Sequence, residues 1–151
     1  ILVLYSLICT LLIGNSWDLN SHILLGKSVL NYLLSFGIIN NDNYTHYREF
    51  YSPSYWTIVY FFIQMFPQKY TFLIFKLFNL VIGWLALIGF YKLNKELFNK
   101  KIATISFLLL YFHPIFFGHL AINPKDIVLA TSHIWVFYLI LEYFRKLCQT
   151  R

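Results

Sequence analysis

Apolar and polar segments alternate along the chain in a pattern that predicts membrane-spanning helices. Residues 1–14 are apolar and uncharged, and three longer apolar stretches cover residues 70–91, 102–122 and 125–144. A helix needs about 20 apolar residues to cross the hydrocarbon core of a bilayer. The sequence therefore predicts an all-α integral membrane protein with about four transmembrane helices. Because the first stretch is too short, we expect it to be the end of a first span and the chain to be a piece of a longer protein.

A long connection, residues 15–69, carries two shorter apolar segments. In residues 20–36 the apolar positions recur with helical spacing, which predicts an amphipathic helix in the membrane interface that ends at Gly37. Residues 52–67 have a proline near each end and an apolar core too short to span, which predicts a re-entrant or interfacial helix. The whole chain, residues 1–151, is thus expected to form one part of a single transmembrane domain.

Composition and charge support this class. Only 12% of the residues are charged and 59% are hydrophobic, whereas soluble domains have about 25% charged residues. The net charge of +6 is therefore no sign of nucleic-acid binding, because lysines and arginines in a membrane protein mark its cytoplasmic side. They follow the second and fourth apolar stretches, at Lys92, Lys95, Lys100, Lys101, Arg145, Lys146 and Arg151. The loop of residues 15–51 and the polar break at residues 113–126 are then extracytoplasmic.

Two carboxylates lie at the extracytoplasmic ends of hydrophobic segments. Asp18 follows the first segment and Asp126 begins the fourth. A charge at membrane depth is usually functional or paired, and a carboxylate can act as a general base on a hydroxyl group. Both side chains could face one cavity at the membrane surface. The alternative is helix capping, with Asn123 as N-cap, Pro124 first in the helix, and Asp18 as the cap of the 20–36 helix. The spacing leaves both interpretations open.

Three cations and a histidine are candidates for binding a phosphate group. Arg48, Lys76 and Lys125 are the basic residues nearest the two carboxylates in the predicted topology. His119 could touch a phosphate or hydrogen-bond a backbone carbonyl freed near Pro114. Lys76 could instead extend its ammonium group to the membrane interface.

A divalent metal site is a further hypothesis. His22 follows Asp18 by four residues, so the two side chains could share a helix face and bind a divalent metal ion together. The alternative is that His22 is an ordinary polar residue of the membrane interface. Spacing alone does not decide between the two.

The order of short motifs resembles a known family. The motifs are Trp17-Asp18 with His22 and Gly26 after the first span, Tyr51-Ser-Pro53 before the short apolar segment, His113-Pro-Ile-Phe-Phe-Gly-His119, and Asn123-Pro-Lys-Asp126. This order resembles the N-terminal part of the GT-C glycosyltransferases. It is most similar to the family 39 type, which includes protein O-mannosyltransferases and the bacterial aminoarabinose transferases of lipid A. The resemblance covers essentially all of the chain but only the front part of such an enzyme.

The resemblance implies an activity and two roles. Such enzymes take a sugar from a polyprenyl-phosphate carrier on the periplasmic or luminal side and transfer it, with inversion, to a hydroxyl acceptor on a lipid, glycan or protein. Asp18 matches the catalytic carboxylate after the first span, and Asp126 matches a second acid at the start of the fourth. The family's first motif is commonly Asp-Glu. Here Leu19 follows Asp18, so the second acid of that motif is missing.

Two other classes of function fit a polytopic membrane chain. One is a transporter or channel fragment, since broken helices and charges at membrane depth mark such proteins. The other is a non-catalytic membrane assembly subunit.

The usage of Ile, Lys, Asn, Phe and Tyr is high, which indicates an AT-rich genome. We therefore expect the protein to lie in a bacterial inner membrane, with its active face on the periplasmic side. We also expect the fragment alone to be inactive, because much of the carrier site would lie in further C-terminal spans.

Overall fold

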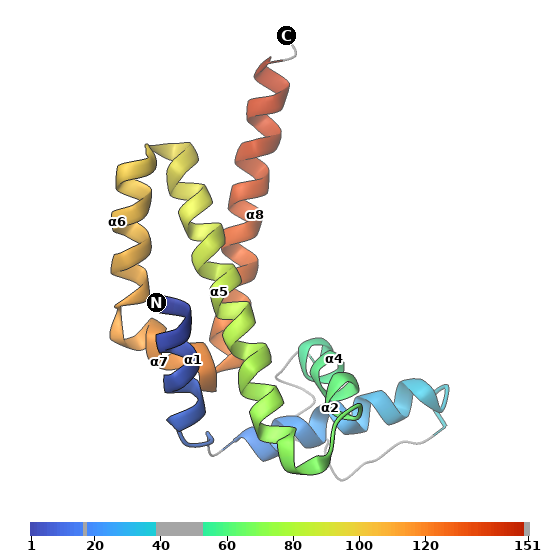
Figure 1. Ribbon diagram of the computed structural model, residues 1–151. Coiled ribbons are helices and arrows are strands. Elements are labelled where there is room, and N and C mark those ends of the chain that lie inside the picture. The colour runs from blue at the N-terminus through green and yellow to red at the C-terminus, as the bar shows by residue number, and fades with distance from the viewer. Residues whose placement is uncertain (17, 39–52, 150–151) are drawn as a thin grey trace. The chain divides into compact units, whose positions relative to one another are not determined.

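The computed structural model describes residues 1–16, 18–38 and 53–149, and every regular element among them is helical (Figure 1). The elements are α1 (Leu2–Leu12), α2 (Leu19–Leu34), α4 (Ser54–Ile63), the short 3-10 helix η2 (Gln68–Tyr70), α5 (Thr71–Leu97), α6 (Lys100–Tyr111), α7 (Pro114–Ile122) and α8 (Pro124–Gln149). The all-α membrane class predicted from the sequence is confirmed.

Within the described residues, two helices are long and apolar enough to cross a membrane. They cover Gln68–Leu97 and Pro124–Gln149. A third span is possible if α6 and α7 are taken together, although these two helices are bent by 66° at the break between them. The break falls at His113 and Pro114, where the proline ring prevents a continuous helix. The bend between α6 and α7 therefore has a local cause, the proline at position 114.

Backbone contacts divide the chain into two units, and the boundary falls inside α5. The first unit consists of Ile1–Ile13 and Lys76–Arg151, and the second is Gly14–Phe75. The first unit thus contains α1, α6, α7, α8 and most of α5. The second unit contains α2, α4 and the first turn of α5.

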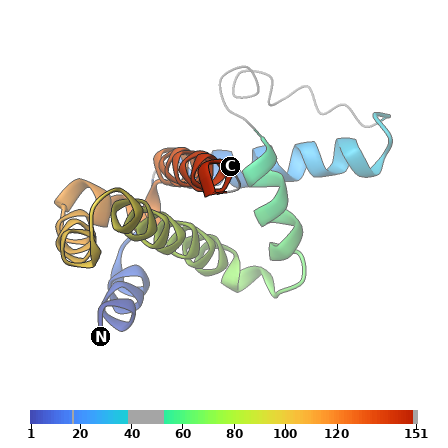
Figure 2. The ribbon, with the colours of Figure 1, turned by 90° about the horizontal axis from the view of Figure 1, so that it is seen from above.

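In the first unit, α8 runs beside α5 in the same direction (Figures 1 and 2). Two side chains of α8 donate to backbone carbonyls of α5: the Thr131 hydroxyl to Ile82 and the Trp135 indole to Leu85, each at 3.1 Å. Gly89 of α5 permits this approach, because a Cβ there would lie 3.0 Å from the indole nitrogen of Trp135. These interhelical bonds satisfy polar groups that lipid cannot satisfy.

The charged ends of these helices lie together. Arg145 of α8 forms an ion pair with Glu96 of α5. The ammonium group of Lys92 lies 5.2 Å from the ring centroid of Trp135 and 5.6 Å from that of Tyr138, distances typical of cation–π contacts. The same end of the unit therefore carries the basic residues of α5 and α8. Its assignment to the cytoplasmic side stays a prediction.

The short helix α1 is held in the first unit by hydrogen bonds from other helices. The indole of Trp84 donates to the Ser6 hydroxyl at 2.9 Å, and the Tyr111 hydroxyl donates to the carbonyl of Leu2 at 2.9 Å. Tyr111 is fully buried. Because these partners lie far along the chain from α1, the helix is fixed by tertiary contacts despite its length.

In the second unit, α2 and α4 cross in close contact (Figure 1). Leu25 of α2 and Val59 of α4 are each only 1% exposed at this crossing. A Cβ on Gly26 would lie 2.4 Å from the carbonyl oxygen of Trp56, so only glycine permits the two backbones to approach this closely. Beyond α2, Gly37 has a φ of 87°, a left-handed conformation that commonly follows a helix end.

Candidate functional site

The Asp18 carboxylate lies at the start of α2 and is held through both of its oxygens. The Ser16 hydroxyl donates to Oδ1 at 2.6 Å, and Nε2 of His22 lies 3.1 Å from Oδ2. Asp18 occupies the N-cap position of α2, but its side chain makes no capping hydrogen bond. The carboxylate is thus directed at two side chains rather than at the helix backbone. Its side chain is 17% exposed, so solvent can reach it.

The His22 imidazole is buried in a stack of aromatic rings. Its plane is nearly parallel to the Trp56 indole, at 6° and 4.0 Å between centroids. The indole in turn stacks on the Phe75 ring at 8° and 5.2 Å. His22 is 2% exposed. The sequence predicted that Asp18 and His22 share a helix face, but it did not predict that Trp56 fixes the ring.

Asp126, near the start of α8, is hydrogen-bonded to the residue that caps this helix. The amide nitrogen of Asn123 donates to Oδ2 of Asp126 at 2.7 Å, and Oδ1 of Asn123 accepts from the backbone N–H of Asp126 at 3.4 Å. Nδ1 of His119 lies 3.3 Å from the same carboxylate oxygen. The predicted N-cap role of Asn123 is confirmed, and Pro124 begins the helix as expected. The Asp126 side chain is 62% exposed.

The Lys76 side chain is buried and points to the end of α1. Its ammonium group donates to the carbonyl oxygen of Ile13 at 2.5 Å, and the residue is 8% exposed. A cation is favourable there, because the last carbonyls of a helix carry partial negative charge. An ammonium group has three donors, and this bond uses one of them.

Sequence reasoning missed Asn79, one turn after Lys76. Asn79 is fully buried, and its amide nitrogen donates to the carbonyls of His119 at 3.1 Å and Leu120 at 3.0 Å. The available signal was an amide side chain inside the apolar stretch 70–91, where a polar group needs a partner. Asn79 joins α5 to α7, the helix that carries His119.

The two remaining predicted site residues are Lys125 and Arg48. Lys125 is half-buried in the first turn of α8. Arg48 lies outside the described residues. His113 caps α7, accepting at Nδ1 from the backbone N–H of Phe116 at 3.5 Å.

Among the residues that the structure describes, no three His, Cys, Asp or Glu side chains form a group that could hold a metal ion. The metal hypothesis for His22 and Asp18 thus stays a prediction.

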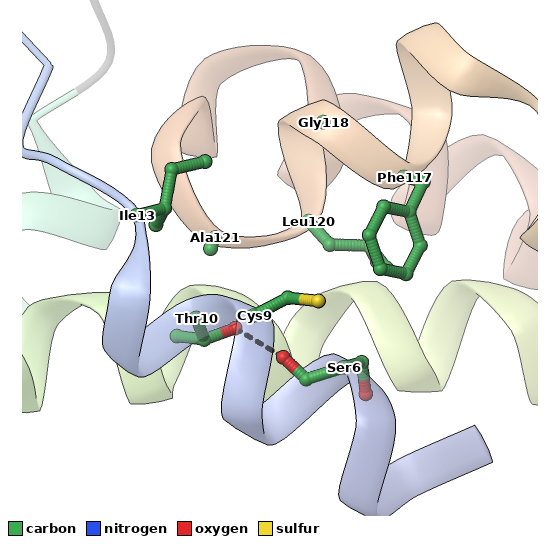
Figure 3. A pocket seen from close by; sticks show the side chains of 8 residues that line it. All are labelled: Ser6, Cys9, Thr10, Ile13, Phe117, Gly118, Leu120 and Ala121. Carbon is green, nitrogen blue, oxygen red and sulfur yellow. Dashed lines mark hydrogen bonds between the residues drawn. The ribbon is translucent and has the colours of Figure 1, made fainter.

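A small cavity in the first unit lies between α1 and α7 (Figure 3). Its volume is about 50 Å³ and it is lined by Ser6, Cys9, Thr10, Ile13, Phe117, Gly118, Leu120 and Ala121. The Thr10 hydroxyl inside it donates to the carbonyl of Ser6 at 2.8 Å. Ligand sites for small molecules typically measure several hundred Å³ or more, so this cavity is a packing void rather than a sugar site.

Comparison with known proteins identifies one family. The sequence model described as dolichyl-phosphate-mannose-protein mannosyltransferase matches residues 52–148, which is more than half of the chain. The match includes α4 and all of α5 to α7, and it ends one residue short of the end of α8. No curated protein and no solved structure matches the chain.

Proposed function

Because the chain belongs to the dolichyl-phosphate-mannose-protein mannosyltransferase family of GT-C membrane glycosyltransferases, we propose that it transfers a sugar from a polyprenyl-phosphate carrier to a hydroxyl acceptor. The family's name specifies mannose and a protein acceptor. For this chain we propose only the chemical classes: a lipid-phosphate-linked sugar and an acceptor hydroxyl on a lipid, glycan or protein. The proposed location is the extracytoplasmic face of a bacterial inner membrane.

The observation that carries this proposal is the environment of Asp18. The carboxylate accepts a hydrogen bond from Ser16, lies 3.1 Å from a nitrogen of His22, and is 17% exposed. A general base needs a fixed orientation and access to the proton that it removes. Asp18 has both properties, and its carboxylate is not used to cap α2.

The proposed reaction is a single displacement. Asp18 accepts the proton of the acceptor hydroxyl as its oxygen attacks the anomeric carbon of the sugar. The bond between that carbon and the phosphate oxygen breaks, and the electron pair leaves with the polyprenyl phosphate. Attack opposite to the leaving group inverts the anomeric configuration. The negative charge that grows on the departing phosphate needs nearby cations and hydrogen-bond donors.

We propose that Asp126 is a second catalytic carboxylate in addition to Asp18. We also propose that four residues contact the phosphate of the sugar carrier. These residues are Arg48, Lys76, His119 and Lys125. Support comes from the start of α8, where His119 and Asp126 are in contact at 3.3 Å beside Lys125. Lys76 also retains ammonium donors beyond the one used by Ile13. That Asp18 and Asp126 face one cavity stays a prediction from the sequence.

The proposal is tested by deleting the gene in the source organism and extracting the membrane lipids. We expect the polyprenyl-phosphate-linked sugar to accumulate, and mass spectrometry would then identify the sugar. The full-length wild-type protein should clear the accumulated lipid, whereas the Asp18→Asn variant, expressed at the same level, should not. A matched control is Glu142→Gln, which removes a carboxylate that pairs with Lys146 near the C-terminal end of α8. No accumulation after deletion, or full clearance by Asp18→Asn, would refute the proposal.

A further inference from the structure

We propose that His22 is a positioning residue that fixes the orientation of the Asp18 carboxylate. This inference rests on the proposed function of Asp18 as base. It adds a role for His22, which takes no part in the bond changes of the proposed displacement. It starts from the direct contact of 3.1 Å between Nε2 of His22 and Oδ2 of Asp18.

The contact redirects a side chain that would otherwise cap a helix. An aspartate at the N-cap position usually accepts from the backbone N–H groups of the first helical turn. Asp18 has the N-cap position but no such bond. Its Oδ2 is directed to His22 and its Oδ1 to the Ser16 hydroxyl. An ionised carboxylate only accepts hydrogen bonds. The proton between His22 and Asp18 therefore belongs to Nε2 of His22.

The imidazole can position the carboxylate because its own ring is fixed. A histidine ring on a helix surface can exchange between several rotamers. Here the ring is 2% exposed and lies flat on Trp56 at 4.0 Å, while Trp56 lies flat on Phe75 at 5.2 Å. Turning the imidazole would break the first stack and move Nε2 away from Asp18. The aromatic stack therefore sets the direction of the hydrogen bond.

Gly26 makes the stack possible. His22 and Gly26 are four residues apart and so lie on the same face of α2. The carbonyl oxygen of Trp56 lies 2.4 Å from the place that a Cβ of Gly26 would occupy. The absent side chain allows the backbone of α4 to contact α2 directly, which places the indole over the imidazole one turn earlier. Gly26 thus allows Trp56 to fix the His22 ring, and His22 in turn orients the Asp18 carboxylate.

The test compares two substitutions of His22 that each keep one of its two properties, the aromatic ring or the hydrogen-bond donor. His22→Phe keeps an aromatic ring on Trp56 but removes the donor, whereas His22→Gln keeps an N–H donor near the position of Nε2. The substrate is the donor lipid purified from the deletion strain, and kcat and KM are measured with the full-length protein. We expect His22→Phe to lower kcat by roughly 10- to 100-fold, the loss typical for a group that orients a functional ligand. The donor KM should not change, and His22→Gln should restore most of kcat.

The positioning role of His22 and the base role of Asp18 can be refuted independently. Wild-type kcat in His22→Phe, or equal losses in the Phe and Gln variants, would overturn the positioning role even if Asp18→Asn is inactive. Full activity in Asp18→Asn would overturn the proposed base itself. As a packing control, Tyr55→Phe alters a ring at the edge of Trp56 and should leave kcat unchanged.

A second measurement does not depend on the folding of a His22 variant. Side-chain nitrogens of the histidines, which include the five of this chain, can be followed by NMR after labelling with ¹⁵N-histidine. We expect one histidine with a protonated Nε2 whose resonance shifts in Asp18→Asn, while the other histidines keep their positions. An unchanged spectrum would show that His22 does not bind the carboxylate and would overturn the inference.

Discussion

The amide nitrogen of Asn79 donates to the carbonyl oxygen of Leu120 at 3.0 Å, across 41 residues of sequence. In a continuous helix this carbonyl would accept from the residue four positions later. That residue is Pro124, which has no N–H. Asn79 therefore supplies the hydrogen bond that the proline cannot, and it does so at a fully buried position. Asn79 thus stabilises the break between α7 and α8.

We predict that Asn79→Ala destabilises the protein by about 1–3 kcal/mol, because a buried carbonyl then lacks its donor. Asn79→Asp should be at least as damaging, since a carboxylate cannot donate to a carbonyl. The measurement is the Tm of the purified protein in detergent. A matched control is Asn94→Ala in the same helix, because the Asn94 amide donates only one turn back, to the carbonyl of Phe90 at 2.8 Å. Equal losses in both alanine variants would contradict the prediction.

The contrast between Asn123 and Asn79 explains what the sequence could reveal. Asn123 caps α8 through contacts within three residues, so local spacing was enough to predict it. Asn79 acts on residues 40 and 41 positions away, and no local pattern specifies such a partner. The spans and the bend at Pro114 followed from apolar length and proline chemistry, which are also local properties.

The same division applies to Asp18 and its surroundings. The four-residue spacing correctly predicted that Asp18 and His22 lie on one helix face. The stack of Trp56 on His22 was not predicted, because it requires α4 to cross α2 at Gly26. The position of Trp56 in the second unit depends on this tertiary contact between two helices.

Gly26 and Gly118 offer a comparison of alanine substitutions. A Cβ at Gly26 would lie 2.4 Å from the carbonyl oxygen of Trp56, which is part of a helix backbone and cannot move independently. A Cβ at Gly118 would meet nothing within 4 Å. We therefore expect Gly26→Ala to lower stability by about 1–3 kcal/mol, the range for overpacking.

Gly118→Ala serves as the control for this comparison and should be neutral or slightly stabilising, because alanine favours a helix more than glycine does. Thermal unfolding of the two variants in detergent measures the difference. If the Gly26 variant were as stable as the wild type, α2 and α4 would not approach as closely as described.

Tyr55 predicts a specific response to alkaline pH. Burial raises the pKa of its phenol above the ordinary value of 10.0, and its hydroxyl has no hydrogen-bond partner among the described residues. In the unfolded chain the phenol ionises near its ordinary pKa, whereas in the folded protein it stays neutral. The unfolded state then binds fewer protons, so the stability contributed by this group falls as pH rises above about 10.

Tyr55→Phe should remove this part of the alkaline sensitivity. At pH 7 we expect the Tm of the variant to equal or exceed that of the wild type, because the substitution removes an unpaired buried hydroxyl. Above pH 10 its advantage should increase. A difference in Tm that stays constant from pH 7 to pH 11 would show that Tyr55 does not titrate differently in the two states.

The ends of α8 should lie in opposite compartments. The helix covers Pro124–Gln149 and is long and apolar enough to span a bilayer. Cys148, near its C-terminal end, is exposed and follows the basic residues Arg145 and Lys146. Since basic residues flank spans on the cytoplasmic side, we predict that Cys148 is cytoplasmic and that Lys125 is extracytoplasmic.

The test uses a maleimide that cannot cross membranes, applied to intact cells. In a Cys9→Ala background, the native Cys148 should react only after the cells are opened. With Cys148→Ala and Lys125→Cys added, the new thiol should react in intact cells. Labelling of both positions from the same side would mean that α8 does not span the membrane. Labelling in the reverse order would place the start of α8, and with it Asp126, in the cytoplasm, where the proposed extracytoplasmic transfer could not use it.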